Sequence, residues 1–285
     1  MKSPNPLNIQ RLKRLPGSIA KQLALIFLSL LTLFPLYFMA TNSFKVQDEF
    51  FANLLGLPQN PILENFTKIL QHPNLGRWFA NSILLTVGSV SLCTIIAILA
   101  AYAFAQMRFP GRDTLFNLIT PLMVIPPIVM VIPMFVLFRQ FHLVNNPGGP
   151  LIIYAGLMLP FTIYLLRNFF VTIPNEIQDA ALIDGCTWFQ VLTKIYLPLS
   201  RPALVTSIIV NAVWVWNELL IALVFLQNEE LRTLIVGITT SLQKRFTLDV
   251  PSLMAGLTVA TVPMIILYII GQNALVRGLV AGYEK

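Results

Sequence analysis

The chain has 285 residues, of which 56% are hydrophobic and 11% are charged, and its mean hydropathy is +0.75. Soluble domains carry about 25% charged residues, so this composition excludes an ordinary soluble domain and predicts an all-α membrane protein with several spans. The formal charge of +7 at pH 7 does not require a nucleic-acid partner, because basic residues on the cytoplasmic loops of a membrane protein produce the same excess.

Six apolar stretches are long enough to cross a bilayer as helices, which takes roughly 20 residues. They cover residues 19–40, 82–106, 114–138, 150–170, 202–226 and 252–276. The first is too long for the apolar core of a secretory signal and lacks a cleavage site, so we interpret it as an uncleaved span. The membrane domain is thus expected at 19–276, between polar tails at 1–18 and 277–285, with a polar loop at 174–201.

Lysine and arginine residues are distributed unequally between the two sides of this predicted topology. With the N-terminus in the cytoplasm, 12 of the 19 Lys and Arg residues fall on cytoplasmic segments and 7 on external ones. Because cytoplasmic loops carry the basic excess, we expect both termini and the 174–201 loop to be cytoplasmic.

Prolines lie inside several expected spans, among them the adjacent Pro126 and Pro127 in the third. Each proline removes a backbone hydrogen bond and is expected to kink its helix. Kinked helices in lipid belong in a packed bundle or beside a water-filled path, so bundle packing and gating are both open interpretations of this pair.

Sequence patterns that carry catalysis are absent. There is no glycine-rich phosphate loop, no His-Glu-x-x-His zinc motif and no Gly-x-Ser-x-Gly nucleophile motif. The histidines His72 and His142 lie in expected loops away from acidic clusters, so we assign no metal site. The chain is therefore expected neither to hydrolyse ATP itself nor to act as an intramembrane enzyme.

One acidic residue, Glu218, lies within an expected span. A charged side chain in a bilayer is costly and usually faces protein or water. Helical spacing places it in a polar stripe with three other residues: Ser207, Asn211 and Trp214. Interhelical packing and the lining of a translocation path are both open for this stripe. A different class of function, an ion-coupled secondary transporter, would use Glu218 as its ion site.

The polar stretch from Pro174 to Pro202 is predicted to form two short helices joined by a hinge. Asn175 is expected to cap the first helix and Gly185 to end it. Thr187 with Gln190 predicts a capping box that starts the second, which Leu197-Pro198 and then Pro202 are expected to end.

One face of the first helix carries Ile177, Ala180, Ala181 and Asp184, at spacings of three, four and seven residues from Ile177. This small, mildly apolar face suits docking to a partner protein. The alternative is an amphipathic linker on the lipid headgroups, which the acidic residues of the first helix disfavour because the cytoplasmic surface is anionic.

The same stretch resembles a known motif. Residues 179–186 read Asp-Ala-Ala-Leu-Ile-Asp-Gly-Cys and are followed by Ile195, Leu197, Pro198 and Pro202. They resemble the EAA loop of ABC-importer permeases, Glu-Ala-Ala-x-x-x-Gly-Ala with a downstream Ile-x-Leu-Pro. Residues 216–219 (Trp-Asn-Glu-Leu) and 277–282 (Arg-Gly-Leu-Val-Ala-Gly) are similar to the smaller permease of maltose-type carbohydrate importers. Asp179, Cys186 and Leu192 stand where the family has Glu, Ala and Phe.

The resemblance implies a type I importer permease of the bacterial cytoplasmic (inner) membrane, with a core of five helices plus one peripheral N-terminal helix. Its partners would be two ATPase subunits that bind ATP and Mg, a second related permease, an external solute-binding protein and membrane lipid. This chain would bind no cofactor and would form part of the path for a sugar, oligosaccharide or polyol. The residues expected to couple it to the ATPase are Ile177, Asp179, Ala180, Ala181, Asp184, Gly185, Cys186, Leu197 and Pro198.

Overall fold

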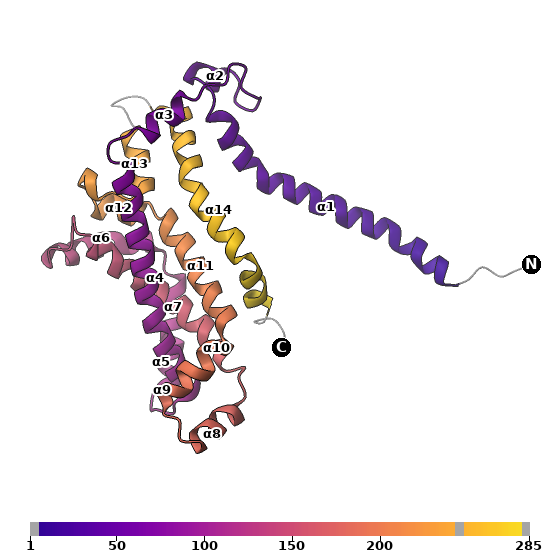
Figure 1. Cartoon of the computed structure of the whole chain (residues 1–285), viewed down its shortest axis with the longest axis vertical. Coiled ribbons are helices and arrows are strands. Elements are labelled where there is room, and N and C mark those ends of the chain that lie inside the picture. The colour runs from indigo at the N-terminus through magenta and orange to yellow at the C-terminus, as the bar shows by residue number, and fades with distance from the viewer. Residues whose placement is uncertain (1–5, 243–247, 281–285) are drawn as a thin grey trace, which may run out of the picture. The chain divides into compact units, whose positions relative to one another are not determined.

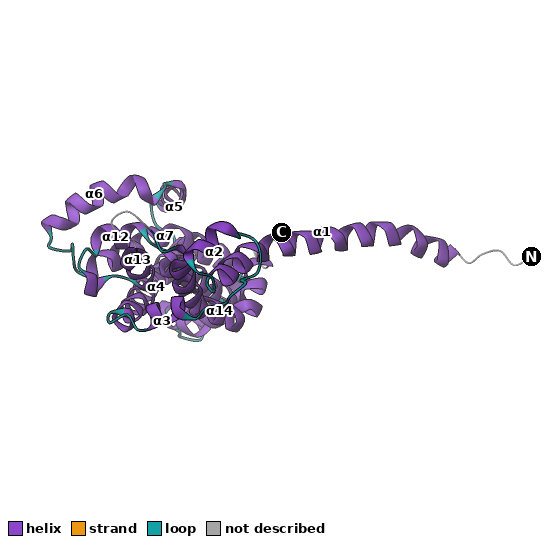
Figure 2. Cartoon of the chain, turned by 90° about the horizontal axis from the view of Figure 1, so that it is seen from above, coloured by secondary structure: helices purple, strands orange, loops and turns teal. Residues whose placement is uncertain are grey.

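The computed structural model describes residues 6–242 and 248–280, with side-chain positions for residues 21–242 and 248–272. Within these ranges the chain is helical and contains no β-strand, as its composition predicts (Figures 1 and 2). The chain divides into two compact units: Met1–Ile69 with Lys244–Thr258, and Leu70–Gln243 with Val259–Lys285.

The first unit begins with a long helix, α1 (Pro6–Asn42), so helical structure starts well before the expected span at residue 19. The most apolar part of its Lys21–Asn42 segment is unburied, as expected of a helix that lies in lipid. Two short helices follow, α2 (Gln47–Ala52) and α3 (Glu64–Leu70).

Buried polar groups organise the segment after α1. The Lys45 side chain is fully buried and its ammonium donates a hydrogen bond to the carbonyl of Asn53. The buried Asn65 amide donates to the carbonyls of Ser43 (2.9 Å) and Lys45 (2.8 Å). Buried polar groups are stable when they are hydrogen-bonded, so this loop holds a defined local fold.

The second unit holds most of the remaining helices. In chain order they are α4 (Leu75–Gln106), α5 (Arg112–Ile119), η1 (Thr120–Val124), α6 (Pro127–Gln140), α7 (Gly148–Phe170), α8 (Asn175–Ile183), α9 (Trp188–Val191), η2 (Leu192–Tyr196), α10 (Leu197–Leu199), α11 (Arg201–Asn217), α12 (Leu220–Phe225), η3 (Glu229–Leu231) and α13 (Leu234–Ser241). The last helix, α14 (Val250–Val280), begins in the first unit and continues in the second.

Helices α4 and α7 make the most extensive contact of the second unit. Cys93, Ala97 and Ala101 recur every four residues along α4 and are fully buried. Small side chains of this kind let helices approach closely in membranes. Two clusters of buried side chains lie in this unit, and the second includes residues of the 174–201 loop. The loop is therefore packed onto the helices.

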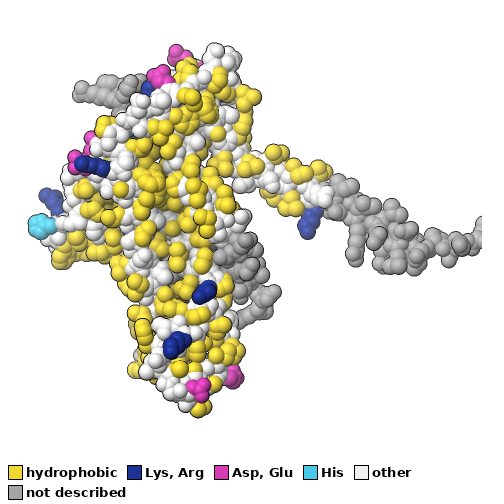
Figure 3. Space-filling view, in the orientation of Figure 1, with side chains coloured by type: hydrophobic (Ala, Val, Ile, Leu, Met, Phe, Trp, Pro, Cys, Tyr) yellow, Lys and Arg dark blue, Asp and Glu magenta, His cyan; other side chains and the backbone are white. Residues whose placement is uncertain are grey.

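Four helical segments are individually long and apolar enough to cross a membrane: Lys21–Asn42, Leu75–Gln106, Gly148–Phe170 and Val250–Gln272. They match the first, second, fourth and sixth expected spans. Up to six spans result if each of two bent helix pairs is one span. Hydrophobic side chains predominate on the face shown in Figure 3, which suits a surface in contact with lipid.

The third expected span, 114–138, is not a single kinked helix. The segment of α5 and η1 meets α6 at an angle of 103°. Ile125 and Pro126 have extended backbone, and Pro127 is the first residue of α6. A proline disfavours helical conformation in the residue before it but suits the first turn of a helix. The proline pair therefore ends one helix and starts another.

The fifth expected span, 202–226, is also interrupted. Helix α11 ends at Asn217, Glu218 is extended (φ −71°, ψ 123°), and α12 begins at Leu220. By contrast, Pro160 lies within the continuous helix α7. The sequence therefore located these spans and did not reveal which of them are broken.

Candidate functional site

A tight turn at Gly185 separates the two helical parts of the 174–201 loop. The N–H of Cys186 bonds the carbonyl of Ala181 (3.0 Å), and the N–H of Gly185 bonds that of Leu182 (3.1 Å). Gly185 has φ +86°. This is the Schellman arrangement that ends helices, and its left-handed residue is usually glycine. The predicted helix stop at Gly185 is confirmed.

The start of α8 differs from the expectation. Asn175 is already the first residue of the helix, Pro174 precedes it, and no side chain caps this end. The expected Asn175 cap is therefore wrong. The fixed backbone angle of proline suits a helix start, which accounts for the shift by one residue.

The predicted capping box at Thr187 is present. The Thr187 hydroxyl accepts a hydrogen bond from the Gln190 N–H (3.3 Å), and the Gln190 side chain accepts one from the Thr187 N–H (2.8 Å). Both bonds join residues three apart, so the local sequence suffices to specify them.

The expected end of the second helix is confirmed, because the helical run stops at Leu199, directly after Leu197-Pro198, and α11 starts at Arg201. The helical run continues from α9 through the π-turn η2 and α10, and it bends by 77° between Trp188–Leu199 and α11. Pro198 lies in the first turn of α10 and Pro202 in the first turn of α11. First-turn positions tolerate a missing N–H, so both prolines begin helical segments here.

The second half of the loop is anchored by aromatic packing. Tyr196 is fully buried, and its ring meets those of Tyr102 on α4 (5.1 Å between centroids) and Phe170 on α7 (5.5 Å) edge to face. Val191 and Leu192 are buried in the same cluster. Such aromatic pairs stabilise beyond their buried area. The loop is thus fixed to the two most closely packed helices of the unit.

Apolar side chains on both sides of the Gly185 turn are exposed. Ile183 is 86% exposed and Phe189 is 67% exposed, and Ile177 and Trp188 are also exposed. Exposed apolar groups gathered on one segment typify a protein interaction surface. We call Ile177, Ile183, Trp188 and Phe189 the apolar docking surface. The sequence reasoning included Ile177 and missed the other three.

Some of the predicted coupling residues are exposed, and others pack against the helices. Ala180, Asp179 and Asp184 are exposed, whereas Ala181 and Cys186 pack against the second buried cluster. Leu197 also packs against that cluster, while Pro198 is exposed. Ala181 therefore does not share an outward face with Ile177 and Ala180. Asp179 and Asp184 form no ion pair among the described residues, which leaves an acidic border beside the apolar docking surface.

Two residues of the predicted polar stripe, Ser207 and Asn211, are buried between helices. The Ser207 hydroxyl donates to the carbonyl of Leu204 in its own helix (2.9 Å). The Asn211 amide donates to Oγ1 of Thr162 on α7 (2.9 Å), and Thr162 donates to the carbonyl of Met158 (2.9 Å). Helices α7 and α11 are therefore joined by a buried polar contact.

Glu218 lies beyond the end of α11, so the stripe is not continuous on one helix face as expected. Its carboxylate accepts hydrogen bonds from the Tyr154 hydroxyl (2.6 Å) and from the N–H groups of Ile221 (2.8 Å) and Ala222 (3.0 Å). The first N–H groups of a helix lack partners within it, so Glu218 caps α12. Trp214 packs edge-on against Tyr154. The geometry explains the stripe as packing, and a role in a solute path stays a prediction.

No group of three or more His, Cys, Asp or Glu residues in the described part of the chain is placed to hold a metal ion. The described site is the apolar docking surface together with the Tyr196 packing that anchors it.

The family model for the inner membrane component of binding-protein-dependent transport systems matches residues 93–280. The chain belongs to this family. The permease is 39% identical over 264 residues to ORF2 of Caldicellulosiruptor sp. (strain Rt8B.4), named as an ABC transporter permease, and the match covers 91% of this chain and 95% of that relative. It is 34% identical over 254 residues to the sulfoquinovosyl glycerol transport system permease protein SmoH of Agrobacterium fabrum (strain C58), covering 89% of each.

Among solved structures, the permease resembles a chain of a bacterial ABC transporter involved in the import of the acidic polysaccharide alginate. The TM-score is 0.78 at 25% identity, and the match covers 96% of the permease and 99% of that chain. The permease therefore has the type I ABC-importer fold that the resemblance implied, and it is a permease subunit of an ABC importer.

Proposed function

We propose that this permease carries a sugar, oligosaccharide or polyol across the bacterial cytoplasmic membrane and takes its energy from separate ATPase subunits. The observation that carries the proposal is the apolar docking surface with its acidic border, presented by a loop anchored on α4 and α7. The names of SmoH and of the alginate transporter support the carbohydrate class.

The topology proposed for this function has six spans with both termini in the cytoplasm. Each of the two bent helix pairs then contributes to one span, and the basic excess falls on cytoplasmic segments. The first helix is peripheral to a core of the other five. The 174–201 loop is then cytoplasmic, where an ATPase can reach it.

The proposed assembly contains two ATPase subunits, a second related permease and an external solute-binding protein. The family description, which names binding-protein-dependent transport, supports the last of these partners. ATP and Mg bind to the ATPase subunits, so this chain supplies a path and a mechanical joint and carries out no chemistry. Closure of the ATPase pair moves α8 as a rigid lever, and the spans rock between inward-facing and outward-facing states.

The experiment that tests this proposal uses Gly185→Pro and Asp184→Lys in the full transporter. Proline cannot adopt the positive φ of Gly185, and lysine reverses the charge of the acidic border. We expect both variants to insert into the membrane and to lose ATP-dependent uptake and solute-stimulated ATPase activity. Gly76→Ala on α4 is the control, because Gly76 has open space around it. Normal coupling in both variants would contradict the docking role.

Copurification in mild detergent tests the partners separately. We expect an ATPase pair and a second permease in fixed ratio with this chain. A lone chain whose uptake is driven by an ion gradient would instead support the ion-coupled alternative, for which the relatives reported above give no support.

A further inference from the structure

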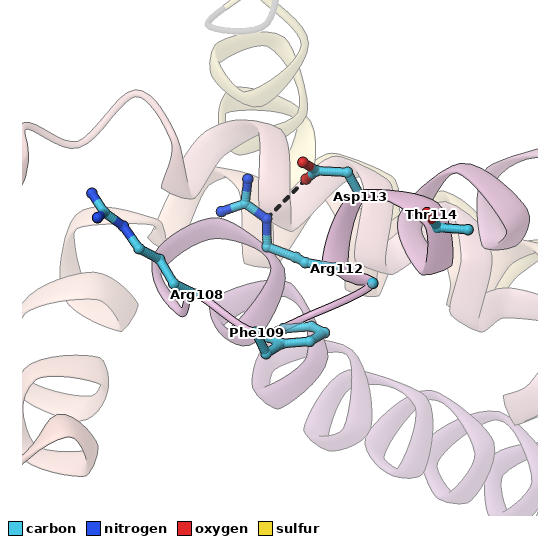
Figure 4. Close-up of a pocket in the computed structure, with 6 residues that line it drawn as sticks. Arg108, Phe109, Arg112, Asp113 and Thr114 are labelled. Carbon is cyan, nitrogen blue, oxygen red and sulfur yellow. Dashed lines mark hydrogen bonds and ion pairs between the residues drawn. The ribbon is translucent and has the colours of Figure 1, made fainter.

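An open pocket of about 410 Å³ lies at the turn between α4 and α5. It is lined by Arg108, Phe109, Gly111, Arg112, Asp113 and Thr114. Figure 4 shows the guanidinium groups of Arg108 and Arg112 on the same side of this turn, with the Phe109 ring on the other. The pocket thus brings two cations together in a short segment.

These cations have unused hydrogen-bonding capacity. Arg108 is exposed and forms no ion pair with any described residue. Arg112 contacts Asp113 through Nε (2.8 Å to Oδ1), and within the described chain its terminal nitrogens make no hydrogen bond. A guanidinium group offers five N–H donors in a planar fork that matches phosphate oxygens. The pocket therefore presents free donors of the kind that bind phosphate.

A third guanidinium lies close by on α7. Arg167 is near enough to interact electrostatically with Asp113, and it sits over the Phe116 ring at 4.7 Å from the centroid. Its Nε is buried without a hydrogen-bond partner in the described part of the chain. Arg112 and Arg167 both act on Asp113, and with Arg108 nearby in the sequence the segment has an excess of positive charge.

Phe109, which lines the pocket, belongs to a group of packed aromatic rings. Phe104 packs against Phe109 (6.0 Å between centroids) and Phe116 (5.7 Å), and Phe116 stacks on Tyr164 (6.3 Å). Arginines that follow the end of a membrane-length helix, as Arg108 and Arg112 follow α4, reach the interface between membrane and water. The pocket is therefore expected at the depth of the lipid headgroups, whichever side of the membrane it faces.

An exposed apolar stripe leads away from the pocket. Leu115, Leu118 and Leu122 recur at spacings of three and four residues, and all three are exposed. Leu115 and Leu118 lie one turn apart on α5, and Leu122 follows in η1. Cations at one end and an apolar stripe beyond them match the two parts of a phospholipid.

We propose that this pocket binds the phosphate of an anionic phospholipid, with an acyl chain along Leu115, Leu118 and Leu122. A phospholipid headgroup and free phosphate both offer a phosphate group to the arginines. The leucine stripe favours the phospholipid, because free phosphate has no apolar part to contact it. Both arginines line this one pocket and keep free donors there, so we assign them a binding role in addition to their effect on the topology. The inference does not depend on the transported solute.

The test uses the whole transporter, reconstituted in phosphatidylethanolamine vesicles with and without phosphatidylglycerol, then extracted in mild detergent. The phosphatidylglycerol retained per complex is counted by native mass spectrometry. We expect Arg108→Gln and Arg112→Gln each to weaken retention about fivefold, the contribution of one arginine near a membrane surface. Arg139→Gln is the matched control, since Arg139 is an exposed arginine that lines a different pocket on α6.

A second arm separates lipid from free phosphate. Inorganic phosphate is added to the lipid-bound complex and compared with chloride at equal ionic strength. Phosphatidylglycerol that stays bound under excess phosphate supports the lipid, because the acyl chain adds contacts that inorganic phosphate lacks. Complete release by phosphate but not by chloride assigns the pocket to a free anion and overturns the proposal. Equal retention in all variants, or an equal loss in Arg139→Gln, also overturns it. Elution as an intact complex shows that each variant is folded.

Discussion

Gly185 and Thr187 together turn the chain between α8 and α9. Gly185 has a positive φ and open space around its α-carbon, so the requirement for glycine is conformational and not steric. Thr187 then satisfies the first N–H groups of the next helix through its capping box. Both effects use hydrogen bonds between residues a few positions apart, which is why they could be predicted from the sequence.

The backbone requirement at Gly185 predicts an order of tolerance among substitutions. Gly185→Ala is expected to cost about 1 to 2 kcal/mol, the penalty for an ordinary residue in left-handed geometry, and Gly185→Asn less, because asparagine tolerates that geometry. The measurement is thermal stability of the purified complex together with its ATP-dependent uptake. Gly76→Ala, at a helical position with open space, should be neutral or slightly stabilising. Equal effects of Ala and Asn at position 185 would rule out the conformational explanation.

The break between α11 and α12 is held by a single side chain. Glu218 accepts hydrogen bonds from two N–H groups of α12 and from the Tyr154 hydroxyl on α7. A helix interruption within a membrane is tolerated where neighbouring groups satisfy the backbone. Glu218 therefore links the element that ends at Asn217 to the one that begins at Leu220.

Replacement of Glu218 is expected to lower stability in proportion to the acceptors removed. Glu218→Ala leaves three donors unpartnered, at about 1 to 3 kcal/mol for each buried group, whereas Glu218→Gln keeps one side-chain oxygen. The melting temperature should fall most for alanine and less for glutamine. Asn217→Ala is the control, since Asn217 is exposed and bonds only within its own helix. Full stability of Glu218→Ala would refute the capping role, and loss of uptake in a fully stable Glu218→Gln would point to the solute path.

Within the second unit, the loop packs directly onto α4 and α7. Tyr196 packs against Tyr102 and Phe170, and Leu166 on α7 is buried in the same cluster. Packed interiors transmit displacement because they have few voids. A force applied at the apolar docking surface therefore reaches the helices through this cluster.

The apolar docking surface predicts where the ATPase attaches. Phe189→Ala should weaken association with the ATPase about fivefold or more, because truncation of an interface anchor typically costs more than about 1 kcal/mol. Association is measured by titrating the ATPase subunit onto the reconstituted permease. Phe141→Ala is the matched control, because Phe141 is 66% exposed and Phe189 is 67% exposed. Unchanged ATPase association in Phe189→Ala would exclude that side chain as an anchor.

The sequence located the loop and its turn but did not predict its outward face. Ala181 was expected beside Ile177, and it packs inward instead, while Ile183 and Phe189 project outward. The spacing along α8 defines which residues share a face. It does not define which face meets α4 and α7, because that depends on residues far away in the chain.

Composition and local motifs by themselves determined the membrane class, the family resemblance, the Gly185 turn and the Thr187 capping box. These features depend on total hydrophobicity or on hydrogen bonds that close within a few residues. The tertiary structure alone decided the 103° break after Val124, the cap that Glu218 places on α12 and the Thr162 partner of Asn211. The physical reason is that a broken helix or a buried amide is stable only when distant segments supply its hydrogen-bonding and packing partners.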